Sequence, residues 1–457
     1  MDGLLEGNND GKRKWIYPLI RKGTFYKWRS RISYVFLIFL FSGPFIRING
    51  QPLLLLNFID RQFVLFGQVF WPQDIFLFML ASLVFLVCIV LFTIAFGRIF
   101  CGWICPQTIF MEMVFRKIEE WIEGDAHKRK KLDAGPWTRE KIIKKTIKTV
   151  VFLFISFLIS NIFLAYIIGS DSLIKIITDP VSEHWLGLLL ISGFAAAFYT
   201  VYSRIREQVC TLFCPYGRLQ GVMTDQHTLV VAYNDVRGEP RGKIDKKAIS
   251  QDDKGDCVDC SLCVEVCPTG IDIRQGTQLE CTNCTACIDV CDEVMDKIHK
   301  PRRLIGFFSE NMIHAREKPS FTGRMMAYSA VILLLTGVLG FFIFSRSDMD
   351  ITVMRSPGLL YQKQAGGYIS NIYNAEIINK TNKSCTIILR SDNPDVKVKY
   401  IQAPGPISVG GSVKTMFFLI MPASEIHKPD IDVHLQLIRD NKIIQSVTTS
   451  FVGPINN

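Results

Sequence analysis

Eight cysteines between residues 257 and 291 form a pattern that is typical of iron–sulfur binding. They occur as two copies of the spacing CxxCxxCxxxC. Two-residue gaps allow three thiolates of one loop to hold one cluster, while the fourth cysteine ligates the cluster of the other copy. The spacing therefore predicts two [4Fe-4S] clusters. One is assigned to Cys257, Cys260, Cys263 and Cys291, and the other to Cys281, Cys284, Cys287 and Cys267.

Structural zinc and disulfide bonds are the alternatives for these cysteines. A zinc site needs only four thiolates and does not explain three evenly spaced cysteines plus a fourth in two successive copies. Disulfides are rare in the reducing cytoplasm, where the charge pattern described below places this segment. Asp292 stands where a proline usually follows the last cysteine, whereas Pro268 follows the first copy. Since this proline is not a ligand, a second cluster is still expected.

Four further cysteines form two CxxxCP motifs: Cys101 with Cys105, and Cys210 with Cys214. If each segment stays helical, its two cysteines share one face and offer two sulfur atoms to one ion. The proline that follows disfavours helix at the second cysteine, which would help that cysteine to turn inward. Sulfur ligands select Cu(I), zinc or iron–sulfur centres, so the repeat predicts a metal or redox site. Small apolar residues beside a proline kink are the alternative.

The elements that must position these cysteines are membrane helices. The chain has 457 residues, of which 49% are hydrophobic and 33 are Phe, a high content for a soluble protein. About twenty apolar residues are needed to cross a bilayer as a helix. Five spans are expected, at residues 32–46, 75–96, 150–168, 185–202 and 325–344. Residues 47–72, between the first two spans, are expected to lie in the membrane interface as an amphipathic stretch.

The net charge of +10 indicates membrane topology and not nucleic-acid binding, because the basic residues flank apolar segments and do not alternate with stacking aromatic residues. Lys and Arg concentrate before the first span, between the second and third, and between the fourth and fifth. With five crossings these three regions share one side. The positive-inside rule then predicts a multi-pass protein of the bacterial inner membrane, with a cytoplasmic N-terminus and ferredoxin and a periplasmic C-terminal domain.

The expected fold class is a multi-domain membrane protein with an α-helical bundle, a bacterial-type two-cluster ferredoxin and an immunoglobulin-like β-sandwich. The sandwich is expected because about seven short alternating runs near the C-terminus are separated by turn residues. The expected domains are a basic N-terminus (1–31), a membrane domain with four helices (32–202), a cytoplasmic region with the ferredoxin at about 250–300 (203–324), a fifth helix (325–345) and the sandwich (346–457).

The order of these parts resembles the cytochrome oxidase accessory proteins of the CcoG/FixG/RdxA type, which are membrane-bound polyferredoxins. The resemblance covers nearly the whole chain and is most specific at residues 100–108 and 257–295, including the sequence CTNCTACIDVCDEVM. It implies reduction of Cu(II) to Cu(I) for the assembly of a cbb-type haem–copper oxidase. It also implies that the catalytic, copper-associated positions are Cys101, Cys105, Cys210 and Cys214.

Two other functions remain open from the sequence: a quinol-linked respiratory carrier that feeds an extracytoplasmic reductase, and a redox-sensing assembly scaffold. The chain contains no Rossmann glycine pattern, so quinol or another protein is the expected electron donor. The other expected partners are the lipid bilayer and either oxidase assembly factors or a copper chaperone. No nucleic acid is expected, and a homo-oligomer is compatible with the sequence.

Overall fold

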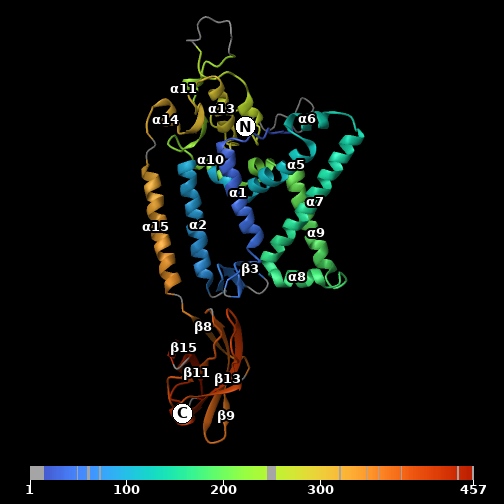
Figure 1. Cartoon of the computed structure of the whole chain (residues 1–457). Helices are drawn as coiled ribbons and strands as arrows, with labels where there is room; N and C mark the ends of the chain where they lie inside the picture. The colour runs from blue at the N-terminus through green and yellow to red at the C-terminus, as the bar shows by residue number, and fades with distance from the viewer. Residues whose placement is uncertain are drawn as a thin grey trace. The chain divides into compact units, whose positions relative to one another are not determined.

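The computed structural model divides into two compact units (Figure 1). Unit 1 comprises residues 1–43, 79–165 and 170–337, and unit 2 comprises residues 44–78, 166–169 and 338–457. The structure describes residues 15–48, 50–58, 62–71, 74–243, 254–318, 321–345, 347–358, 360–381, 383–439 and 442–454. The first part of the expected basic N-terminus, residues 1–14, therefore lies outside the described residues.

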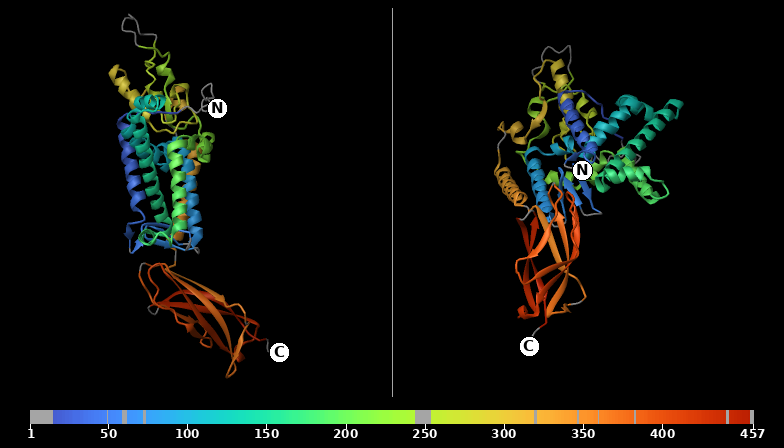
Figure 2. Two further views of the ribbon diagram at one scale, coloured as in Figure 1. Left: turned by 90° about the vertical axis from the view of Figure 1, so that its right-hand side faces the viewer. Right: turned by 60° about the horizontal axis from the view of Figure 1, so that its bottom comes forward.

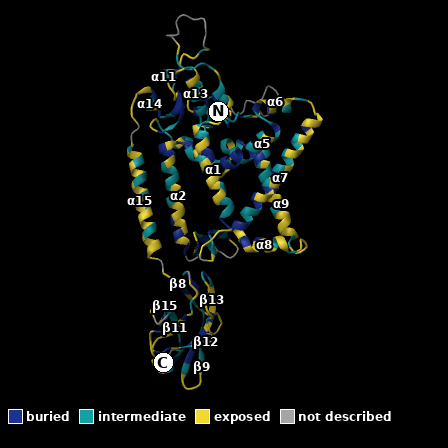
Figure 3. Ribbon diagram, in the orientation of Figure 1, coloured by how far each residue is buried: buried dark blue, intermediate teal, exposed yellow. Residues whose placement is uncertain are grey.

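Four helices among the described residues are long and apolar enough to cross a membrane. They are α2 (Ile75–Phe96), α7 (Arg139–Ile168), α9 (Trp185–Thr200) continued by η3 (Val201–Ile205), and α15 (Gly323–Phe344). Most of the large apolar side chains of these helices are not covered by other parts of the chain (Figure 3). Such exposure is expected where a helix is surrounded by lipid. These helices correspond to the second to fifth predicted spans, and they identify the chain as a membrane protein.

Helix α1 (Thr24–Ser42) corresponds to the first predicted span but is not one of these four. It begins eight residues before residue 32, so its first two turns are basic, with Lys27, Arg29 and Arg31. The apolar second half of α1 packs through Leu37 and Phe41 against an aromatic cluster that includes Phe152 of α7 and Phe198 of α9. The helix is therefore part of the bundle even though its composition is mixed.

Short helices connect the long ones in unit 1. They are α3 (Ile99–Trp103), α4 (Pro106–Thr108), η2 (Ile109–Phe115), α5 (Arg116–Glu123), α6 (Ala126–Ala134), α8 (Ser170–Thr178), η4 (Val209–Phe213) and α10 (Pro215–Met223). The segment η2 is a π-helix whose Phe115 ring stacks on Tyr202 of η3 with ring centroids 4.7 Å apart. This aromatic contact holds the segment that follows the first CxxxCP motif against the end of the fourth predicted span.

The ferredoxin region also belongs to unit 1. Its elements are β6 (Val230–Tyr233), α11 (Asp235–Gly238), α12 (Leu262–Glu265), η5 (Ile273–Gln275), α13 (Ala286–Lys297), β7 (Ile305–Phe308) and α14 (Glu310–His314). Strands β6 and β7 pair antiparallel, with Val230 opposite Phe308. Ile288 of α13 and Val231 of β6 lie in the buried core beneath the cysteine loops, so the hairpin and α13 support these loops.

Unit 2 contains a β-sandwich (Figure 2). One sheet has the order β12–β13–β10–β8, with β9 also paired to β10, and the other has the order β11–β14–β15. The strands are β8 (Met349–Arg355), β9 (Gln362–Gln364), β10 (Tyr368–Asn379), β11 (Ile388–Ser391), β12 (Lys397–Gln402), β13 (Ser412–Pro422), β14 (Asp430–Arg439) and β15 (Lys442–Val452). Alternating residues from both sheets, such as Tyr373, Phe417 and Phe451, form one core.

The segment between α1 and α2 consists of strands, which the sequence pattern did not indicate. They are β1 (Arg47–Ile48), β2 (Gln51–Pro52), β3 (Leu54–Asn57), β4 (Gln62–Leu65) and β5 (Gln68–Phe70). In the three-stranded sheet β3–β4–β5, Leu55, Val64 and Val69 form a small buried cluster. Because more buried and less buried residues alternate along its strands, this stretch is amphipathic as expected. Its described residues form strands of a sheet.

Candidate iron–sulfur and thiol site

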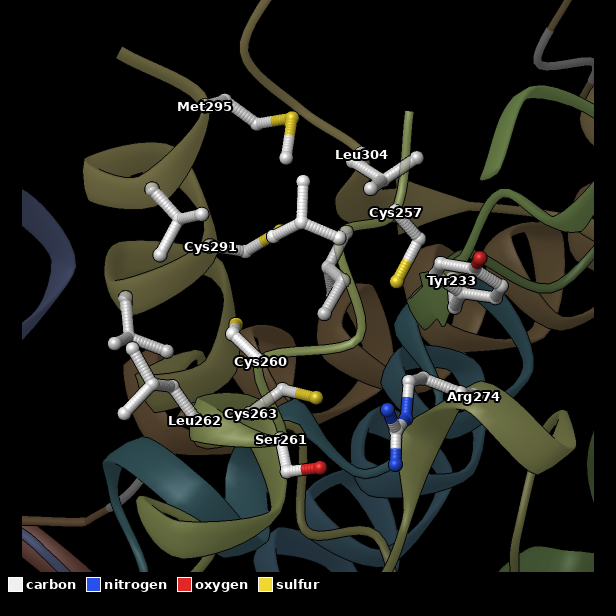
Figure 4. Close-up of a pocket in the computed structure, with 14 residues that line it drawn as sticks. Tyr233, Cys257, Cys260, Ser261, Leu262, Cys263, Arg274, Cys291, Met295 and Leu304 are labelled. Atoms are coloured by element: carbon white, nitrogen blue, oxygen red, sulfur yellow. The ribbon is translucent and has the colours of Figure 1, made fainter. Parts of the chain in front are cut away.

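The cysteines assigned to the first cluster line one small cavity (Figure 4). Cys257 and Cys260 come from the loop that leads into α12, Cys263 comes from α12 itself, and Cys291 comes from α13. Arg274 also lines this cavity and is held by ion pairs to Asp272 and Asp259. The other walls are largely apolar and include Val290, Met295, Leu304 and Ile305.

The cysteines assigned to the second cluster line a neighbouring cavity. Cys281, Cys284 and Cys287 surround it together with Cys267, and Cys263 also reaches this cavity. The structure thus brings together both predicted sets, including the crossed positions of Cys267 and Cys291. All of these cysteines are free thiols. This grouping supports the predicted ligand assignment.

The spacing of the sulfur atoms distinguishes a cluster from a single zinc ion. A tetrahedral site with Zn–S bonds of about 2.3 Å places its sulfur atoms about 3.8 Å apart. Among the described residues, no three cysteine sulfurs lie within 4.8 Å of one another. The described cysteines therefore do not form a preformed zinc site of three or four thiolates.

The same backbone geometry recurs in both cysteine loops. Asp259 and Ser261, on either side of Cys260, have φ angles of 50° and 56°, and the equivalent Asn283 and Thr285 beside Cys284 have angles of 51° and 66°. Left-handed residues of this kind are uncommon outside glycine. Because they turn the chain sharply on both sides of the middle cysteine, three thiols of each loop can face one cavity.

Burial distinguishes the two cavities and controls the protonation of their thiols. Of the eight cysteines only Cys260 is exposed. Burial raises the pKa of Cys263, Cys281 and Cys291 to about 12 in each case, so these thiols are protonated at neutral pH when no metal is bound. Because thiolates are the ligands, binding of the iron–sulfur clusters must release protons.

Both CxxxCP motifs break the helix at their second cysteine. Cys105 has φ −56° and ψ 125°, and Cys214 has φ −74° and ψ 110°. In each case the following proline occupies the first turn of a new helix, a position where its missing N–H costs little. The expected role of the proline is thus observed, but the two cysteines of each motif do not share the face of one continuous helix.

The four motif thiols lie within electrostatic reach of one another. Burial, with further contributions from Cys105 and Cys101, raises the pKa of Cys210 to about 12. Burial also raises the pKa of Cys101, and Cys105 and Cys214 contribute to that rise. Two segments more than 100 residues apart therefore gather their thiols in one region, as the repeat predicted.

The first CxxxCP motif contacts the loop assigned to the second cluster. The backbone of Gly102 approaches Thr282 and Cys284 so closely that a Cβ atom on Gly102 would lie 3.0 Å from the amide nitrogen of Cys284. The indole N–H of Trp103 donates a hydrogen bond to the carbonyl oxygen of Asn283 at 3.2 Å. The side-chain amide of Asn283 in turn donates a hydrogen bond to the carbonyl oxygen of Phe96, also at 3.2 Å. The thiol region and the second cavity are thus adjacent.

Arg98 connects three segments of the site. Its buried guanidinium donates to the side-chain oxygen of Gln220 at 3.0 Å, to the carbonyl oxygen of Cys210 at 3.4 Å and to the carbonyl oxygen of Leu279. The Cys101 thiol lies 3.3 Å from the same Gln220 oxygen. The roles of Arg98 and Gln220 were not predicted, because nothing in their spacing links them to residues more than 100 positions away.

A network of buried charges continues from the site. Burial alone would raise the pKa of Glu119, but Arg206, Lys148 and Arg129 hold this pKa below its ordinary range. The three cations lie 2.6, 3.0 and 3.1 Å from the carboxylate. Beside this group, Arg116 forms ion pairs with Glu112 and Glu207 and donates to the carbonyl oxygen of Pro268, which follows Cys267. Ion pairs thus join the helices to the cysteine loops.

A separate group of acidic and imidazole side chains lies between α8 and α9. Asp179, Glu183 and His184 place their ligand atoms within 4.8 Å of one another, and His184 hydrogen-bonds Asp179 at 3.2 Å. The side chains are largely solvent-accessible, and hydrogen bonding within such a group does not by itself indicate a bound metal.

Three family models match the chain. A 4Fe-4S binding domain matches residues 78–130, a 4Fe-4S dicluster domain matches residues 205–310, and a model described as the IG-like fold at the C-terminal of FixG matches residues 339–454. The expected fold class is thereby confirmed. The first model includes Cys101 and Cys105, and the second includes the other ten cysteines discussed above.

Curated relatives match most of the chain. The nitrogen fixation protein FixG of Rhizobium meliloti is 33% identical over 422 residues, which cover 83% of this chain and 79% of that protein. Protein RdxB of Cereibacter sphaeroides is 36% identical over 387 residues, which cover 81% and 80%. A crystal structure of a FixG-related protein from Vibrio parahaemolyticus covers 23% of this chain and 97% of its own at 16% identity, with a TM-score of 0.20, too low to bear on the fold.

Proposed function

The chain belongs to the FixG/RdxA family of membrane iron–sulfur electron-transfer proteins, and from this premise we propose that it reduces Cu(II) to Cu(I). The Cu(I) serves the assembly of a cbb-type cytochrome c oxidase. Copper is the substrate, and the clusters are the resident cofactors. Both the copper reaction and its destination rest on the family resemblance together with the chemistry of the thiol region.

One observation carries the proposal: the first CxxxCP motif is packed directly against the loop assigned to the second cluster. Gly102 lies between Cys101 and Cys105, and its backbone touches the segment that contains Cys284. A thiol site that received electrons from the ferredoxin would require this proximity. We assign substrate binding to the thiols of the two motifs, Cys101, Cys105, Cys210 and Cys214.

The chemistry needs few groups besides sulfur. When bound, the [4Fe-4S] clusters supply electrons one at a time. Reduction of Cu(II) to Cu(I) consumes one electron and makes or breaks no covalent bond in an organic substrate. Thiolates favour Cu(I) over Cu(II), and the Cys101 and Cys210 thiols release their protons when they bind the ion. The site therefore requires no separate catalytic acid.

We further propose that the N-terminus and the ferredoxin are cytoplasmic and that the β-sandwich is periplasmic. This topology requires α1 to be a fifth crossing. Its support is that the apolar half of α1 packs with α7 and α9 in one aromatic cluster, while Lys27 and Arg31 are exposed at its basic end. Such an arrangement agrees with a preference of cations for the cytoplasmic side.

Copper turnover by the purified protein tests the proposal. Full-length protein is reduced with dithionite, freed of excess reductant and mixed with Cu(II) and a Cu(I)-specific chelator. We expect Cu(I) formation by the wild type and its loss in Cys101→Ser/Cys105→Ser and in Cys210→Ser/Cys214→Ser, with EPR signals of both clusters retained. Cys88→Ala, which changes a thiol outside the motifs, serves as the control.

The copper assay, together with deletion of the β-sandwich, distinguishes the alternative functions. If both double variants keep the wild-type rate of Cu(I) formation, copper does not use these thiols, and the quinol-linked carrier becomes the better interpretation. If deletion of the β-sandwich blocks oxidase assembly while Cu(I) formation continues, the sandwich has a scaffold role beside the reductase.

A further inference from the structure

A basic cleft at the start of α1 has no role in the electron-transfer site. The cleft has a volume of about 600 Å³ and lies between α5 and the first part of α1 with the residues just before it. This volume is within the range of small-molecule sites, about 300–1,000 Å³. Its lining residues are Ile20, Lys22, Tyr26, Lys27, Ser30, Arg31, Tyr34, Lys117 and Glu120.

The charge of the cleft is strongly positive. Four cations, Lys22, Lys27, Arg31 and Lys117, face one carboxylate, Glu120. Within the described part of the chain none of these four cations forms an ion pair with a carboxylate. The buried Arg29 of the same helix behaves differently, because its guanidinium lies 3.8 Å from Glu112. The chain thus neutralises the inward-facing cation of α1 and leaves the cleft cations available to an anion.

Aromatic side chains hold one of these cations in place. The Lys117 ammonium lies 5.4 Å from the ring centroid of Tyr26 and 4.9 Å from that of Tyr34, and it donates a hydrogen bond to the Tyr34 hydroxyl at 3.1 Å. Cation–π contacts of this kind restrict a flexible lysine. The cleft therefore presents an oriented ammonium group between two tyrosines, beside the exposed Lys27 and the exposed Arg31, whose guanidinium lies 5.2 Å from the ring centroid of Trp28.

The cleft continues into an apolar stripe on the outer face of α1. Lys27, Arg31, Tyr34 and Ile38 follow one another at helical spacings of three or four residues, so they lie along one side of the helix. Val35 and Ile38 are 66% and 67% exposed. A ligand with an anionic group and long apolar chains fits this surface. Its anionic group would lie in the cleft, and its apolar chains would lie along α1.

We propose that this cleft binds the phosphate headgroup of an anionic phospholipid. Basic pockets between membrane helices are suited to such headgroups, and an Arg together with Lys residues supplies charge-assisted hydrogen bonds to phosphate. A free phosphate would use the same cations but not the apolar stripe. The lipid would also stabilise the contact between α1 and the ferredoxin. In this contact Arg29, which lies between Lys27 and Arg31 in the sequence, donates a hydrogen bond to the carbonyl oxygen of Cys284 at 2.9 Å.

Lipid binding to the full-length protein in neutral detergent tests the proposal. Native mass spectrometry counts bound phosphatidylglycerol and phosphatidylcholine with matched acyl chains, and inorganic phosphate is added in a parallel sample. We expect selective binding of phosphatidylglycerol, weakened on the order of thirtyfold in Lys27→Gln/Arg31→Gln. Lys130→Gln/Lys131→Gln removes the same charge from exposed positions of α6 outside the cleft and should bind as the wild type does.

Three results would overturn the assignment: equal binding of phosphatidylcholine, an equal loss in the α6 control variant, or displacement of the lipid by inorganic phosphate at comparable concentration. The last result would assign the cleft to a soluble phosphate compound. The visible absorption of the clusters and the melting temperature without lipid are measured for each variant. Because Lys27 and Arg31 are exposed and form no ion pair, both quantities should stay at wild-type values.

Discussion

Gly102 of the first CxxxCP motif lies against the carbonyl group of Thr282, which is the residue between Cys281 and Asn283 in the second cysteine loop. Any side chain at position 102 would enter the space of this backbone. Because hydrogen bonds from Trp103 to Asn283 and from Asn283 to Phe96 also join these segments, neither segment can move away at low cost. The contact therefore sets the separation between the thiol region and the second cavity.

Gly102→Ala should push the two segments apart. A methyl group would overlap the Thr282 carbonyl oxygen and the backbone of Cys284, and overpacking of this kind costs about 1–3 kcal/mol. We expect a lower melting temperature and slower Cu(I) formation. Gly193→Ala is the matched control, because nothing lies within 4 Å of the added atom in α9. Wild-type copper kinetics in Gly102→Ala would show that this contact does not set the electron path.

The crossed ligand sets predict which cluster each single variant loses. Cys291→Ser should remove or convert the cluster in the cavity with the exposed Cys260, although Cys291 follows the second loop in sequence. Cys267→Ser should affect the other cluster. Low-temperature EPR of the reduced protein together with iron analysis measures both effects, and loss of the opposite cluster in either variant would refute the assignment.

Asp289 of α13 caps the start of α1. Its carboxylate accepts hydrogen bonds from the amides of Phe25 and Tyr26 at 3.0 and 2.7 Å, where the positive end of the helix dipole favours an anion. Asp289→Ala should therefore cost about 1 kcal/mol. Faster hydrogen–deuterium exchange at these two amides would report the effect. Asp296→Ala, which removes a solvent-exposed partner of Arg302, should leave their exchange unchanged.

The buried carboxylate of Glu119 predicts a loss of stability in acid. Because the charges of Arg206, Lys148 and Arg129 depress its pKa, Glu119 contributes stability that is fully present above its ordinary pKa of 4.5 and declines as the pH falls below that value. Glu119→Gln should remove the carboxylate that faces the buried Arg206 and Arg129, while Lys148 keeps Glu123 at 2.8 Å. Loss of this carboxylate should cost about 3–5 kcal/mol.

Melting temperatures between pH 7 and pH 4 measure this effect. The gap between the wild type and Glu119→Gln should be constant near neutrality and should narrow at the acid end, because below about pH 4.5 Glu119 takes up a proton in the unfolded chain while it stays ionised in the folded chain. Lys144→Gln is a suitable control, since Lys144 forms a surface pair with Glu140, and such pairs contribute little. A gap independent of pH would contradict the role given to the charge of Glu119.

Sequence periodicity predicted the parts of the fold that depend on local pattern. The cysteine sets were predictable because the position of Cys267 and Cys291 follows from a spacing rule. The strand runs of the β-sandwich were predictable from alternation, except for β9 (Gln362–Gln364), which is short and polar. Asp292 departs from the usual proline for a reason visible only in the structure: α13 continues through this position, where a proline would break the helix.

Other features depend on contacts between distant segments, and no local pattern encodes them. The start of α1 at Thr24 was not predicted, because the first two turns of this helix are basic and do not resemble a membrane span. The contacts of Arg98 with Cys210 and Leu279 join residues 112 and 181 positions apart, a relationship that only the folded chain reveals.

A single-turnover experiment tests the central claim most directly. Fully reduced protein, free of excess reductant, is mixed with Cu(II) while cluster absorption and Cu(I) formation are followed together. We predict about two Cu(I) ions per protein, one for each cluster oxidised, with both events occurring at the same rate. In Cys101→Ser/Cys105→Ser the clusters should stay reduced and no Cu(I) should form. Cluster oxidation at the wild-type rate in that variant would contradict the account.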